Sequence, residues 1–419
     1  MLLTMWGIVM RRKKYRLWQS CMVMLLLIQS LKGNPLDLKA IYSEQISIET
    51  NKALEQIAQD YEEITEVITI GYSTTKQTEI KALKLGKGEK SILINGTHHG
   101  REALTTVLIL NQISYLAEAY VEKQTINGQD VRTVLNTVSI WFVPLVNPDG
   151  ATIALSTRPE WKANGRGVDL NRNYPTLYTT IATKPTPGPS GYAGTEAFSE
   201  LETQALRDLC KVQEFEAAIA YHSAGEVIYW WYHQTGELYK HSLVIGRMLS
   251  HATQYSLVPI SQSRGGRGFT DWFIQSLKKP SFTLEVGKNA NGKRLSLMEY
   301  DQIWKANKEI PFLLAKEMIN LNSHEWQVTI NEEQIKGKTI FGRGVVPVKG
   351  ICQALNLNYS YMPEQKQISL TDGNNILSFK QGEKIALYNE EPLEIVVPAH
   401  IQDGEMYLPL KNILELFSM

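Results

Sequence analysis

The sequence of 419 residues predicts an α/β protein, an α/β/α sandwich with a mixed, mostly parallel sheet, followed by a small α+β domain. Two observations predict this architecture. As far as about residue 320, apolar segments typical of buried strands alternate with amphipathic helical segments, which indicates a sheet covered by helices on both faces. Beyond residue 320 the segments become short and alternating, and a Pro-centred segment at residues 347–355 has a counterpart at residues 409–417.

The individual elements follow from local periodicity. Apolar residues at helical spacing predict helices, and short apolar runs rich in β-branched and aromatic residues predict strands. The helices are expected at residues 51–61, 103–122, 200–212, 241–254, 270–277 and 298–321. The strands are expected at residues 64–72, 80–85, 91–96, 138–146, 217–221, 227–231 and 281–286.

The first residues have the composition of an export signal. A basic cluster at residues 11–16 precedes a mostly apolar stretch at residues 17–31, which is shorter than the roughly 20 residues of a membrane-spanning helix. We therefore expect a signal peptide or N-terminal anchor at residues 1–33, a main domain at residues 34–322 and an α+β module at residues 326–419. The protein is then expected outside the cell, without membrane contact once the signal is removed.

Charge and cysteine content narrow the classes of partner. The chain has 43 basic and 43 acidic residues, but every charged residue among the first 33 is basic, so the remainder carries an acidic excess. Such a balance argues against a nucleic-acid partner. Beyond the signal only Cys210 and Cys352 remain, in different expected domains, so no disulfide framework is predicted.

A candidate metal site begins with His99 and Glu102, a His-x-x-Glu pair at the turn into the helix expected at residues 103–122. Residues three apart at such a turn can direct an imidazole nitrogen and a carboxylate oxygen at one point, as zinc requires. His222 is the candidate third ligand, because it ends the strand expected at residues 217–221 and ligands gather at the carboxyl ends of strands in an α/β sheet. A His₂Glu set with an open fourth position is the catalytic arrangement, although each histidine taken alone is more often a satisfied polar group.

Glu285 ends another apolar strand, at residues 281–286. A carboxylate among apolar neighbours is costly unless it is paired or functional. Beside a metal-bound water it could act as general base and then give the proton to a leaving amine. The alternative is an inward-facing acid paired with Lys or Arg.

Residues 161–175 are rich in hydrogen-bond donors. Arg172 and Asn171 offer a planar fork and an amide, which suit a carboxylate. Lys162 or Arg166 could stabilise the negative charge that develops on an attacked carbonyl. The alternative for this segment is an ordinary surface loop with solvated charges.

Five motifs occur in an order and at a spacing that resemble the zinc carboxypeptidase family, over about residues 40–320. They are His99-Gly-Arg-Glu102, Asn147-Pro-Asp-Gly150, Gly167-Val-Asp-Leu-Asn-Arg-Asn173, His222-Ser223 and Phe282-Thr-Leu-Glu285. The resemblance implies the fold of that family and a zinc-dependent peptidase, with one Zn²⁺ as its cofactor and a peptide as its substrate.

The resemblance also implies a role for each matching residue. The zinc ligands would be His99, Glu102 and His222, with Glu285 as general base, Arg101 as a substrate contact, and Asn171 and Arg172 on a substrate carboxylate. Where the family usually has an Arg just after a Trp, this chain has Lys162, with Arg166 close by. Which of the two serves is left open by the sequence.

A second departure concerns the substrate. The stretch before Asp271 contains Arg264 and Arg267 where digestive members have a substrate-covering Tyr, and these arginines suit an acidic substrate. The segment at residues 161–172 is similar to that of bacterial members that cut γ-D-glutamyl–meso-diaminopimelate bonds in peptidoglycan stem peptides. The alternatives are a general metallocarboxypeptidase, which would share every catalytic residue, and a non-catalytic wall-binding protein.

The C-terminal module resembles the copper amine oxidase N-terminal-like domain through its two Pro-centred half-repeats, at residues 347–355 and 409–417. That domain often accompanies secreted proteins of Gram-positive bacteria, and the likeness implies no bound copper. We expect this module to contact the cell wall.

Overall fold

The structure is a computed structural model that describes residues 36–263, 265–288, 291–320, 326–340, 343–383, 385–395, 398–402 and 404–417. The export signal expected at residues 1–33 lies outside the described residues. Among the helices that the structure does describe, none combines the length and the apolar character that crossing a bilayer requires.

The first unit, residues 36–320, is built on an eight-stranded sheet with the order β1-β2-β6-β3-β7-β10-β8-β9. Its central strands are parallel: β6 pairs with β3, β3 with β7, and β7 with β10. Strands β8 and β9 are also parallel, whereas the pairings of β1 with β2, β2 with β6 and β10 with β8 are antiparallel. Four of the seven pairings are thus parallel, and the sheet is mixed and mostly parallel, as predicted. Its strands are β1 (Thr65–Tyr72), β2 (Glu79–Leu85), β3 (Lys90–Gly96), β6 (Val138–Val143), β7 (Phe215–His222), β8 (Val227–Tyr229), β9 (Ser256–Leu257) and β10 (Ser281–Glu285).

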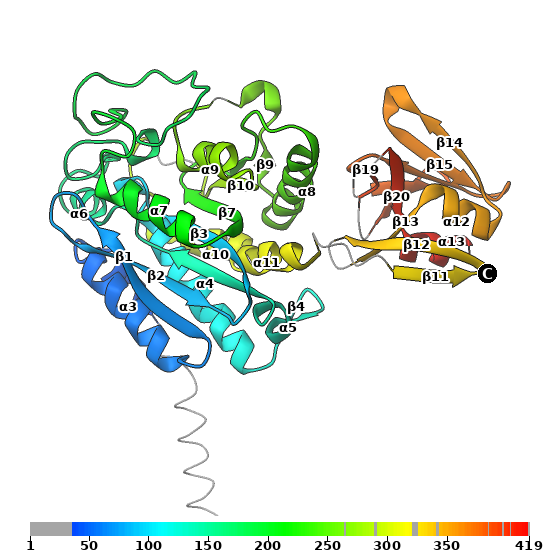
Figure 1. Cartoon of the computed structure of the whole chain (residues 1–419), viewed down its shortest axis with the longest axis horizontal. Helices are drawn as coiled ribbons and strands as arrows, with labels where there is room; N and C mark the ends of the chain where they lie inside the picture. Colours follow the sequence, from blue (N-terminus) through cyan, green and yellow to red (C-terminus); the bar gives the residue numbers. More distant parts are fainter. Residues whose placement is uncertain are drawn as a thin grey trace, which may run out of the picture.

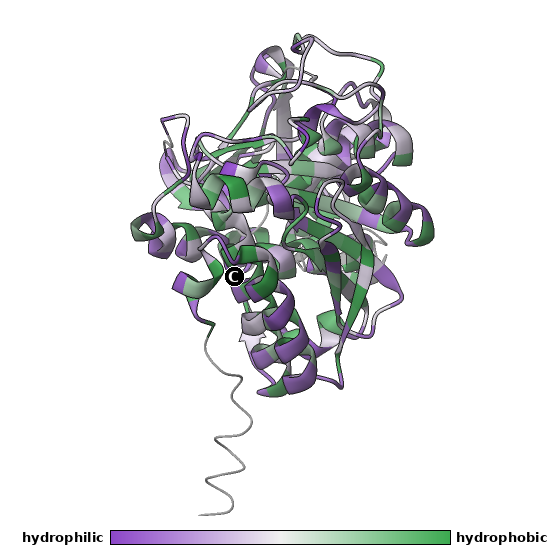
Figure 2. Cartoon of the chain, turned by 90° about the vertical axis from the view of Figure 1, so that its left-hand side faces the viewer, coloured by the Kyte–Doolittle hydropathy of each residue, from purple (hydrophilic) through white to green (hydrophobic). Residues whose placement is uncertain are grey.

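Helices cover both faces of this sheet (Figure 1). In β3, Ile92 and Ile94 belong to one hydrophobic core and Leu93 to the other, because alternate residues of a strand point to opposite faces. The first core includes residues of α3 (Ile46–Asp60), α4 (Leu104–Val121), α5 (Val131–Leu135), α8 (Gly236–Thr253), α10 (Tyr300–Asn307) and α11 (Ile310–Asn320). The second includes residues of α7 (Leu201–Val212) and α9 (Phe269–Leu277). Figure 2 shows the hydrophobic colour concentrated in the strands and the hydrophilic colour on the outer helical surfaces.

Three helical segments differ locally from the prediction, and two of these differences have a signal in the sequence. The helix expected at residues 298–321 is divided into α10 and α11, and Pro311 at the second position of α11 lacks the amide that a continuous helix would need. Helix α8 begins five residues before the expected residue 241, at Gly236. Helix α6 (Pro148–Ser156) was not expected, although Asn147 caps it by accepting from the amide of Gly150 and Pro148 stands at its start, both usual signals of a helix N-terminus. The smaller elements are α2 (Leu38–Ile41) and a hairpin of β4 (Thr125–Ile126) with β5 (Gln129–Asp130).

The second unit, residues 326–417, contains two five-stranded antiparallel sheets. One has the order β11-β12-β13-β20-β19, with β11 (Trp326–Ile330), β12 (Glu333–Ile340), β13 (Arg343–Pro347), β20 (Glu405–Pro409) and β19 (His400–Gln402). The other has the order β14-β15-β16-β17-β18, with β14 (Asn358–Met362), β15 (Gln367–Thr371), β16 (Ile376–Lys380), β17 (Ile385–Tyr388) and β18 (Glu391–Glu394).

The two half-repeats of this unit lie side by side. Strand β13 leads into α12 (Val348–Leu355), β20 leads into α13 (Leu410–Phe417), and the two strands pair with Val346 opposite Leu408. Both helices contribute to one core, so the duplication seen in the sequence is a repeated strand–helix unit.

Candidate metal centre

The candidate site lies where three parallel strands end. Strand β3 ends at Gly96, next to Tyr221 in the pairing with β7. Strand β7 ends at His222, and β10 ends at Glu285, directly opposite His222 in the register of these two strands. The sheet therefore brings segments more than a hundred residues apart to one edge, which is where α/β proteins place their ligands.

His99, Glu102 and His222 converge there. The Nδ1 atoms of the two histidines lie 3.2 Å apart. One Glu102 oxygen lies 2.9 Å from Nδ1 of His99, and the other lies 2.8 Å from Nδ1 of His222. All three side chains are buried, and one ligand atom from each lies within 4.8 Å of the others. The structure thus brings together the three residues that the sequence singled out as ligands.

The electrostatics of Glu102 favour an ionised carboxylate. Burial works against ionisation, but His99 and His222 together hold the pKa of this carboxyl well below its ordinary value. The amide of Ser223 also donates to Glu102 Oε2 at 3.2 Å. A buried carboxylate held in this way is ready to act as an anionic metal ligand.

Asp169 is a functional residue that the sequence reasoning missed. Its Oδ1 lies 3.1 Å from Nε2 of His99, and its Oδ2 accepts from the amide of Gly191 at 2.9 Å. This contact places the ring proton of His99 on Nε2 and leaves Nδ1 free toward Glu102 and His222, which is the usual second contact of a metal-binding histidine. Asp169 stands in the Val-Asp-Leu-Asn-Arg segment that was noticed for its donors, so an acid among those donors was the available signal.

This donor set fits Zn²⁺. Two imidazole nitrogens and a carboxylate are typical zinc ligands, and Zn–N bonds of about 2.0–2.1 Å in tetrahedral geometry place the nitrogens roughly 3.4 Å apart. The two Nδ1 atoms lie 3.2 Å apart, with both nitrogens on the side of the Glu102 carboxylate. His99, Glu102 and His222 would hold the ion and leave room for a fourth ligand.

The structure separates the two candidate cations. Lys162 Nζ lies 3.7 Å from Glu102 Oε1, beside the ligand set. Arg166 is instead half-exposed, with its Nε 3.9 Å from Glu200 Oε2. Arg101 also adjoins the centre, since its Nε lies 4.0 Å from Glu102 Oε1 while its Nη1 donates to the carbonyl of Gly292. Of the two cations left open by the sequence, only Lys162 lies next to the expected metal ligands.

The Glu285 carboxyl is electrostatically coupled to the ligand set. Burial, together with the nearby Glu102 carboxylate, raises the pKa of Glu285 from 4.5 to about 8, and Lys162, His99 and Arg101 act in the opposite direction. These couplings place the Glu285 carboxyl among the charges of the ligand set. A bound divalent cation would lower this pKa because it favours the ionised carboxylate.

Asn171 and Arg172 flank the centre on a short turn at Leu170–Arg172. Asn171 Nδ2 lies 3.4 Å from Nε2 of His222, and its Oδ1 accepts from the amide of Phe269 at 3.0 Å. Arg172 Nη1 donates to the carbonyl of Asn171 at 2.7 Å, which bends the guanidinium back over the same turn. Asn171 therefore lies beside a metal ligand, and Arg172 lies on the same turn, while the carboxylate-binding role that the resemblance implies for the pair stays a prediction.

Close backbone packing fixes the segment at residues 99–102, which carries the candidate ligands His99 and Glu102. The amides of Gly100 and Arg101 donate to the carbonyls of Lys162 and Trp161 at 2.9 and 2.8 Å. A Cβ atom at Gly100 would lie 2.2 Å from the carbonyl oxygen of Gly150, so only glycine fits there. The glycine of the His-Gly-Arg-Glu motif is thus explained by the approach of α6.

His98 is a second residue that the sequence reasoning passed over. It is buried, its Nε2 lies 3.0 Å from the Tyr174 hydroxyl, and its ring stacks on His222 with centroids 5.7 Å apart. Burial holds the pKa of His98 well below its ordinary value, so the ring is neutral. The spacing of three residues to Glu102 singled out His99, and no such pattern pointed to His98.

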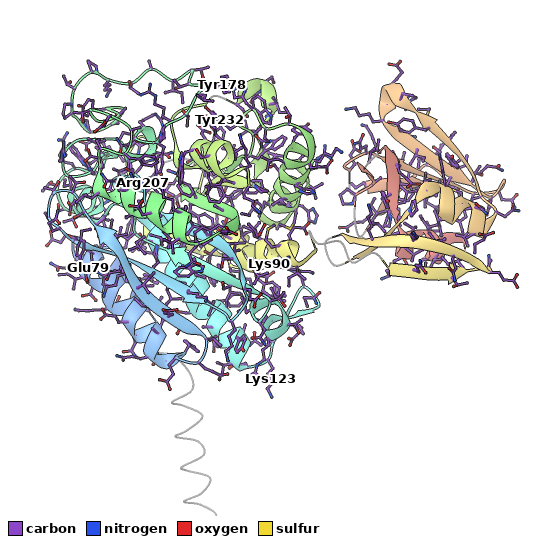
Figure 3. All side chains as sticks on the ribbon, viewed as in Figure 1. Glu79, Lys90, Lys123, Tyr178, Arg207 and Tyr232 are labelled. Atoms are coloured by element: carbon purple, nitrogen blue, oxygen red, sulfur yellow. The ribbon has the colours of Figure 1, made fainter. Side chains whose placement is uncertain are left out.

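The loop before α9 packs beside Arg172. Tyr178 and Tyr232, labelled in Figure 3, are joined by a 2.6 Å hydrogen bond from the Tyr232 hydroxyl to the Tyr178 carbonyl. A Cβ atom at Gly265 would lie 2.5 Å from that same carbonyl oxygen and from the Tyr232 ring, so the chain can pass there only as glycine. Arg267 of this loop is exposed, and Arg264 lies outside the described residues.

Asp271 gives this loop a measurable pH dependence. Its Oδ2 accepts from the amide of Gly266 at 2.7 Å, and burial raises the pKa of its carboxyl from 3.8 to about 6. Because the folded pKa is the higher one, this group stabilises the fold fully below about pH 3.8 and loses that contribution as the pH rises through about 6. The wild-type protein should therefore lose unfolding free energy between pH 5 and pH 8. Asp271→Asn, which cannot titrate, is expected to lose about 1 kcal/mol less over the same range, as measured by urea denaturation.

The matched control is Asp301→Asn, at an exposed position in the first turn of α10, which should leave the pH dependence of the wild type unchanged. An Asp271→Asn protein with the full wild-type dependence would contradict the assigned cause.

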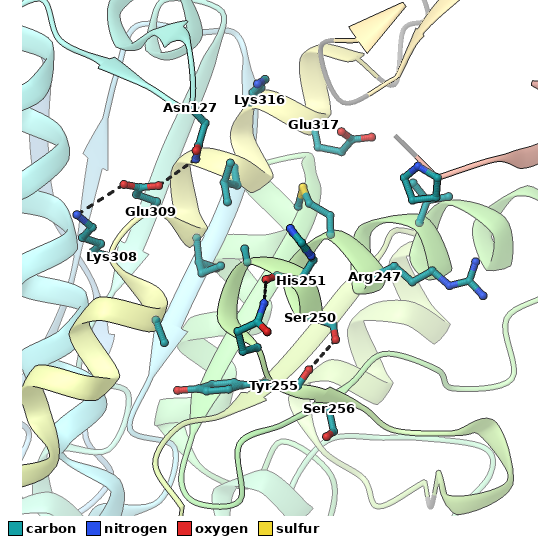
Figure 4. Close-up of a pocket in the computed structure, with 18 of the residues that line it drawn as sticks. Asn127, Arg247, Ser250, His251, Tyr255, Ser256, Lys308, Glu309, Lys316 and Glu317 are labelled. Carbon is teal, nitrogen blue, oxygen red and sulfur yellow. Dashed lines mark hydrogen bonds and ion pairs between the residues drawn. The ribbon is translucent and has the colours of Figure 1, made fainter. Parts of the chain in front are cut away.

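A cavity of about 850 Å³ lies away from the metal centre. Figure 4 shows it beside α8 and α11, with Arg247, His251, Tyr255, Lys316 and Glu317 among its labelled side chains. Gly382, Pro398 and Ala399 of the second unit also line it, and none of the expected site residues does.

Comparison with known proteins identifies the family. A family model for zinc carboxypeptidases matches residues 50–310, and one for the copper amine oxidase N-terminal domain matches residues 330–419. The chain is 30% identical over 258 residues to a γ-D-glutamyl-L-diamino acid endopeptidase of Lysinibacillus sphaericus, covering 56% of this chain and 63% of that protein. It is also 30% identical over 183 residues to a carboxypeptidase B of Astacus astacus, covering 41% of this chain and 57% of that protein. These matches span less than two thirds of each relative.

Solved structures agree on the fold. The structure superposes on thrombin-activatable fibrinolysis inhibitor with a TM-score of 0.55 at 19% identity, covering 68% of this chain and 77% of that one. It superposes on carboxypeptidase A of Helicoverpa armigera with a TM-score of 0.54 at 21% identity, covering 64% and 71% of the two chains. With a family model matching more than half of its length, and the three buried ligands on one sheet edge, this chain belongs to the zinc carboxypeptidase family.

Proposed function

We propose that this protein is a secreted zinc metallopeptidase that hydrolyses γ-D-glutamyl–diaminopimelate bonds in peptidoglycan stem peptides. The observation that carries the hydrolytic part is the convergence of His99, Glu102 and His222, with Glu285 opposite His222 in the strand register. A non-catalytic binding protein would have no use for a complete metal-ligand set with a further carboxyl opposite one of the ligands.

Zinc bound by His99, Glu102 and His222 would supply a Lewis acid and a water of lowered pKa. The residues of the chain perform the remaining tasks. Glu285 takes a proton from the attacking water and passes it to the leaving amine. This role needs the ionised carboxylate, which a bound divalent cation would favour by lowering the raised pKa of Glu285. Because Glu285 is anchored at the end of β10, its carboxyl keeps a fixed position relative to β7 and His222.

Lys162 places a positive charge beside the ligand set, where it stabilises the negative charge that develops on the attacked carbonyl. Asn171 offers an amide beside His222, and Arg172 offers a guanidinium on the same turn, so we assign the two to a carboxylate of the substrate. Arg101 adds a further cation at the centre. This concentration of positive charge favours an acidic peptide over a neutral one.

Support for the particular bond comes from the similarity to the γ-D-glutamyl-L-diamino acid endopeptidase of Lysinibacillus sphaericus. Export is proposed from residues 1–33, whose basic and apolar blocks have the layout of a signal, and contact with the cell wall is proposed for the second unit. A general carboxypeptidase would use the same catalytic residues, so substrate preference must decide between the two activities.

The deciding experiment compares two substrates at the same concentration of zinc-loaded enzyme. With L-Ala-γ-D-Glu-meso-diaminopimelate we expect kcat/KM to exceed that for hippuryl-Phe or hippuryl-Arg by about 100-fold or more, because buried polar groups of a site select strongly against substrates that leave them unpaired. Mass spectrometry of the products identifies the bond that is cut. Faster cleavage of the hippuryl dipeptides would assign the chain to general carboxypeptidases, and no cleavage of either substrate would remove the proposed hydrolysis.

A further inference from the structure

Strand β14 is an edge of the second unit that pairs with β15 alone among the strands that the structure describes. It stands at one end of the five-stranded sheet β14-β15-β16-β17-β18, and all five of its residues, Asn358–Met362, are exposed. In Figure 1 it lies on the outer side of the hairpin that it forms with β15. An edge strand leaves one row of backbone amides and carbonyls without strand partners, so it can accept a further strand.

The two edges of this sheet differ in a way that bears on association. The opposite edge, β18, reads Glu-Pro-Leu-Glu, and its Pro392 and the charges of Glu391 and Glu394 are devices that keep an edge from pairing. Strand β14 reads Asn-Tyr-Ser-Tyr-Met, with no charge and no proline, and it pairs with β15 without a bulge. One edge is therefore protected by its sequence and the other is not.

The side chains of β14 extend both faces of the sheet. Tyr359 and Tyr361 stand opposite Leu370 and Ile368, which belong to the core, yet the two tyrosines are 43% and 42% exposed. They continue the apolar face beyond the point where the core covers it. Ser360 continues the other face, since it stands opposite Ser369.

The hydroxyl row on that other face runs across three strands. Ser369 is opposite Ser360 on one side and opposite Ser378 on the other, and the hydroxyls of Ser369 and Ser378 lie 2.8 Å apart. The apolar face and the hydroxyl row of the sheet thus both end at β14, and a further strand paired with β14 would extend both.

We propose that β14 pairs in antiparallel fashion with β14 of a second copy of this chain, about a two-fold axis at Ser360. In this register Tyr359 of each copy faces Tyr361 of the other, giving two aromatic cross-strand pairs on the apolar face. The two serine rows join into one. Each residue near the axis meets its own kind, and because β14 is uncharged no like-charge repulsion arises there.

The proposed contact is small and closed. Five residues from each copy take part, which places the interface at the weak end of specific associations, so the dimer is expected to form reversibly with increasing concentration. A two-fold contact uses the same edge on both copies and leaves no further β14 edge, so it ends at two chains rather than growing into a fibre. The dimer would carry two metal centres.

Cross-linking tests the register directly. Residues directly opposite each other in an antiparallel pair have Cα atoms about 4.5–5.5 Å apart, which is within the range of a disulfide. Ser360→Cys in the full zinc-loaded chain is therefore expected to form a disulfide-linked dimer at micromolar concentration, at least about tenfold faster than Pro392→Cys on the exposed opposite edge. Equal rates for the two variants, or no linkage at Ser360→Cys, would overturn the proposal.

Sedimentation equilibrium tests the association without a cross-link. The wild-type chain should show twice the mass of one chain as its concentration rises, and Ser360→Lys, which opposes two ammonium groups across the axis, should raise the dimer dissociation constant at least about tenfold. Pro392→Lys should leave the dissociation constant unchanged. A wild-type chain that stays monomeric, or a Ser360→Lys protein that dimerises as well as the wild type, would contradict the proposed interface.

Discussion

Glu285→Gln is expected to leave zinc bound and to lower kcat by about 10³-fold. The amide has nearly the shape of the carboxyl but cannot accept the proton of the attacking water, and a positioned general base contributes about 10²–10⁴-fold. Glu285 lies opposite His222 but does not belong to the ligand set, so the ion should stay in place. Zinc content by atomic emission and kcat on the γ-D-glutamyl tripeptide are the two measurements.

The matched comparison is His222→Ala, which removes a ligand and should lower both zinc affinity and activity. The loss of zinc affinity in His222→Ala should be larger than the roughly 10–100-fold loss that is typical when a residue hydrogen-bonded to a metal ligand is changed. A Glu285→Gln protein with turnover near that of the wild type would exclude Glu285 as the base. If instead the Gln variant lost its zinc, Glu285 would belong with the ligands.

Lys162→Ala is expected to lower kcat/KM by about 10²–10³-fold, whereas Arg166→Ala should have little effect. Removing one group that stabilises the developing oxyanion typically has an effect of this size. Lys162 Nζ lies 3.7 Å from Glu102 Oε1, while Arg166 is directed to Glu200. Steady-state kinetics of the two variants on the same peptide separate the roles that the sequence had left open.

Two further observations distinguish electrostatic catalysis from structural support by Lys162. Lys162→Arg keeps the charge and should recover most of the activity, because the family itself usually has Arg at this place. Lys162 also lowers the pKa of Glu285, so Lys162→Ala should move the acidic limb of the pH–rate profile to higher pH. An unchanged profile, or a larger loss in Arg166→Ala, would show that the assignment is wrong.

Much of the fold was predictable because the local hydrophobic pattern of most segments agrees with the burial that the fold gives them. The central strands are buried on both faces, so they appear in the sequence as largely apolar runs such as residues 138–146. The break between α10 and α11 and the start of α6 were missed, although Pro311 and the Asn147-Pro148 pair carried the signals. Strand β8 ends at Tyr229, before the expected residue 231. An apolar run indicates which residues are buried, but it does not show where hydrogen bonding to the neighbouring strand stops.

The candidate site was only partly predictable. Spacing indicated His99 and Glu102 as ligands, since a turn fixes residues three apart. The acid at Asp169 was visible among the donors of its segment, but its contact with His99 joins positions seventy residues apart and could not be predicted from local spacing. Nor could composition distinguish Lys162 from Arg166, because both are cations in one donor-rich segment and only the folded loop decides which faces Glu102.

By itself the sequence determined the α/β architecture, the residue types of the zinc site and the family, because apolar periodicity and short motifs are local properties that survive without coordinates. The tertiary structure alone decided that His222 and Glu285 share a register, that Asp169 contacts His99, and that Lys162 rather than Arg166 lies beside the ligands. The physical reason is that a catalytic site depends on distances of a few ångströms between segments far apart in the chain. Such distances are set by strand pairing and loop packing, and one-dimensional spacing does not contain them.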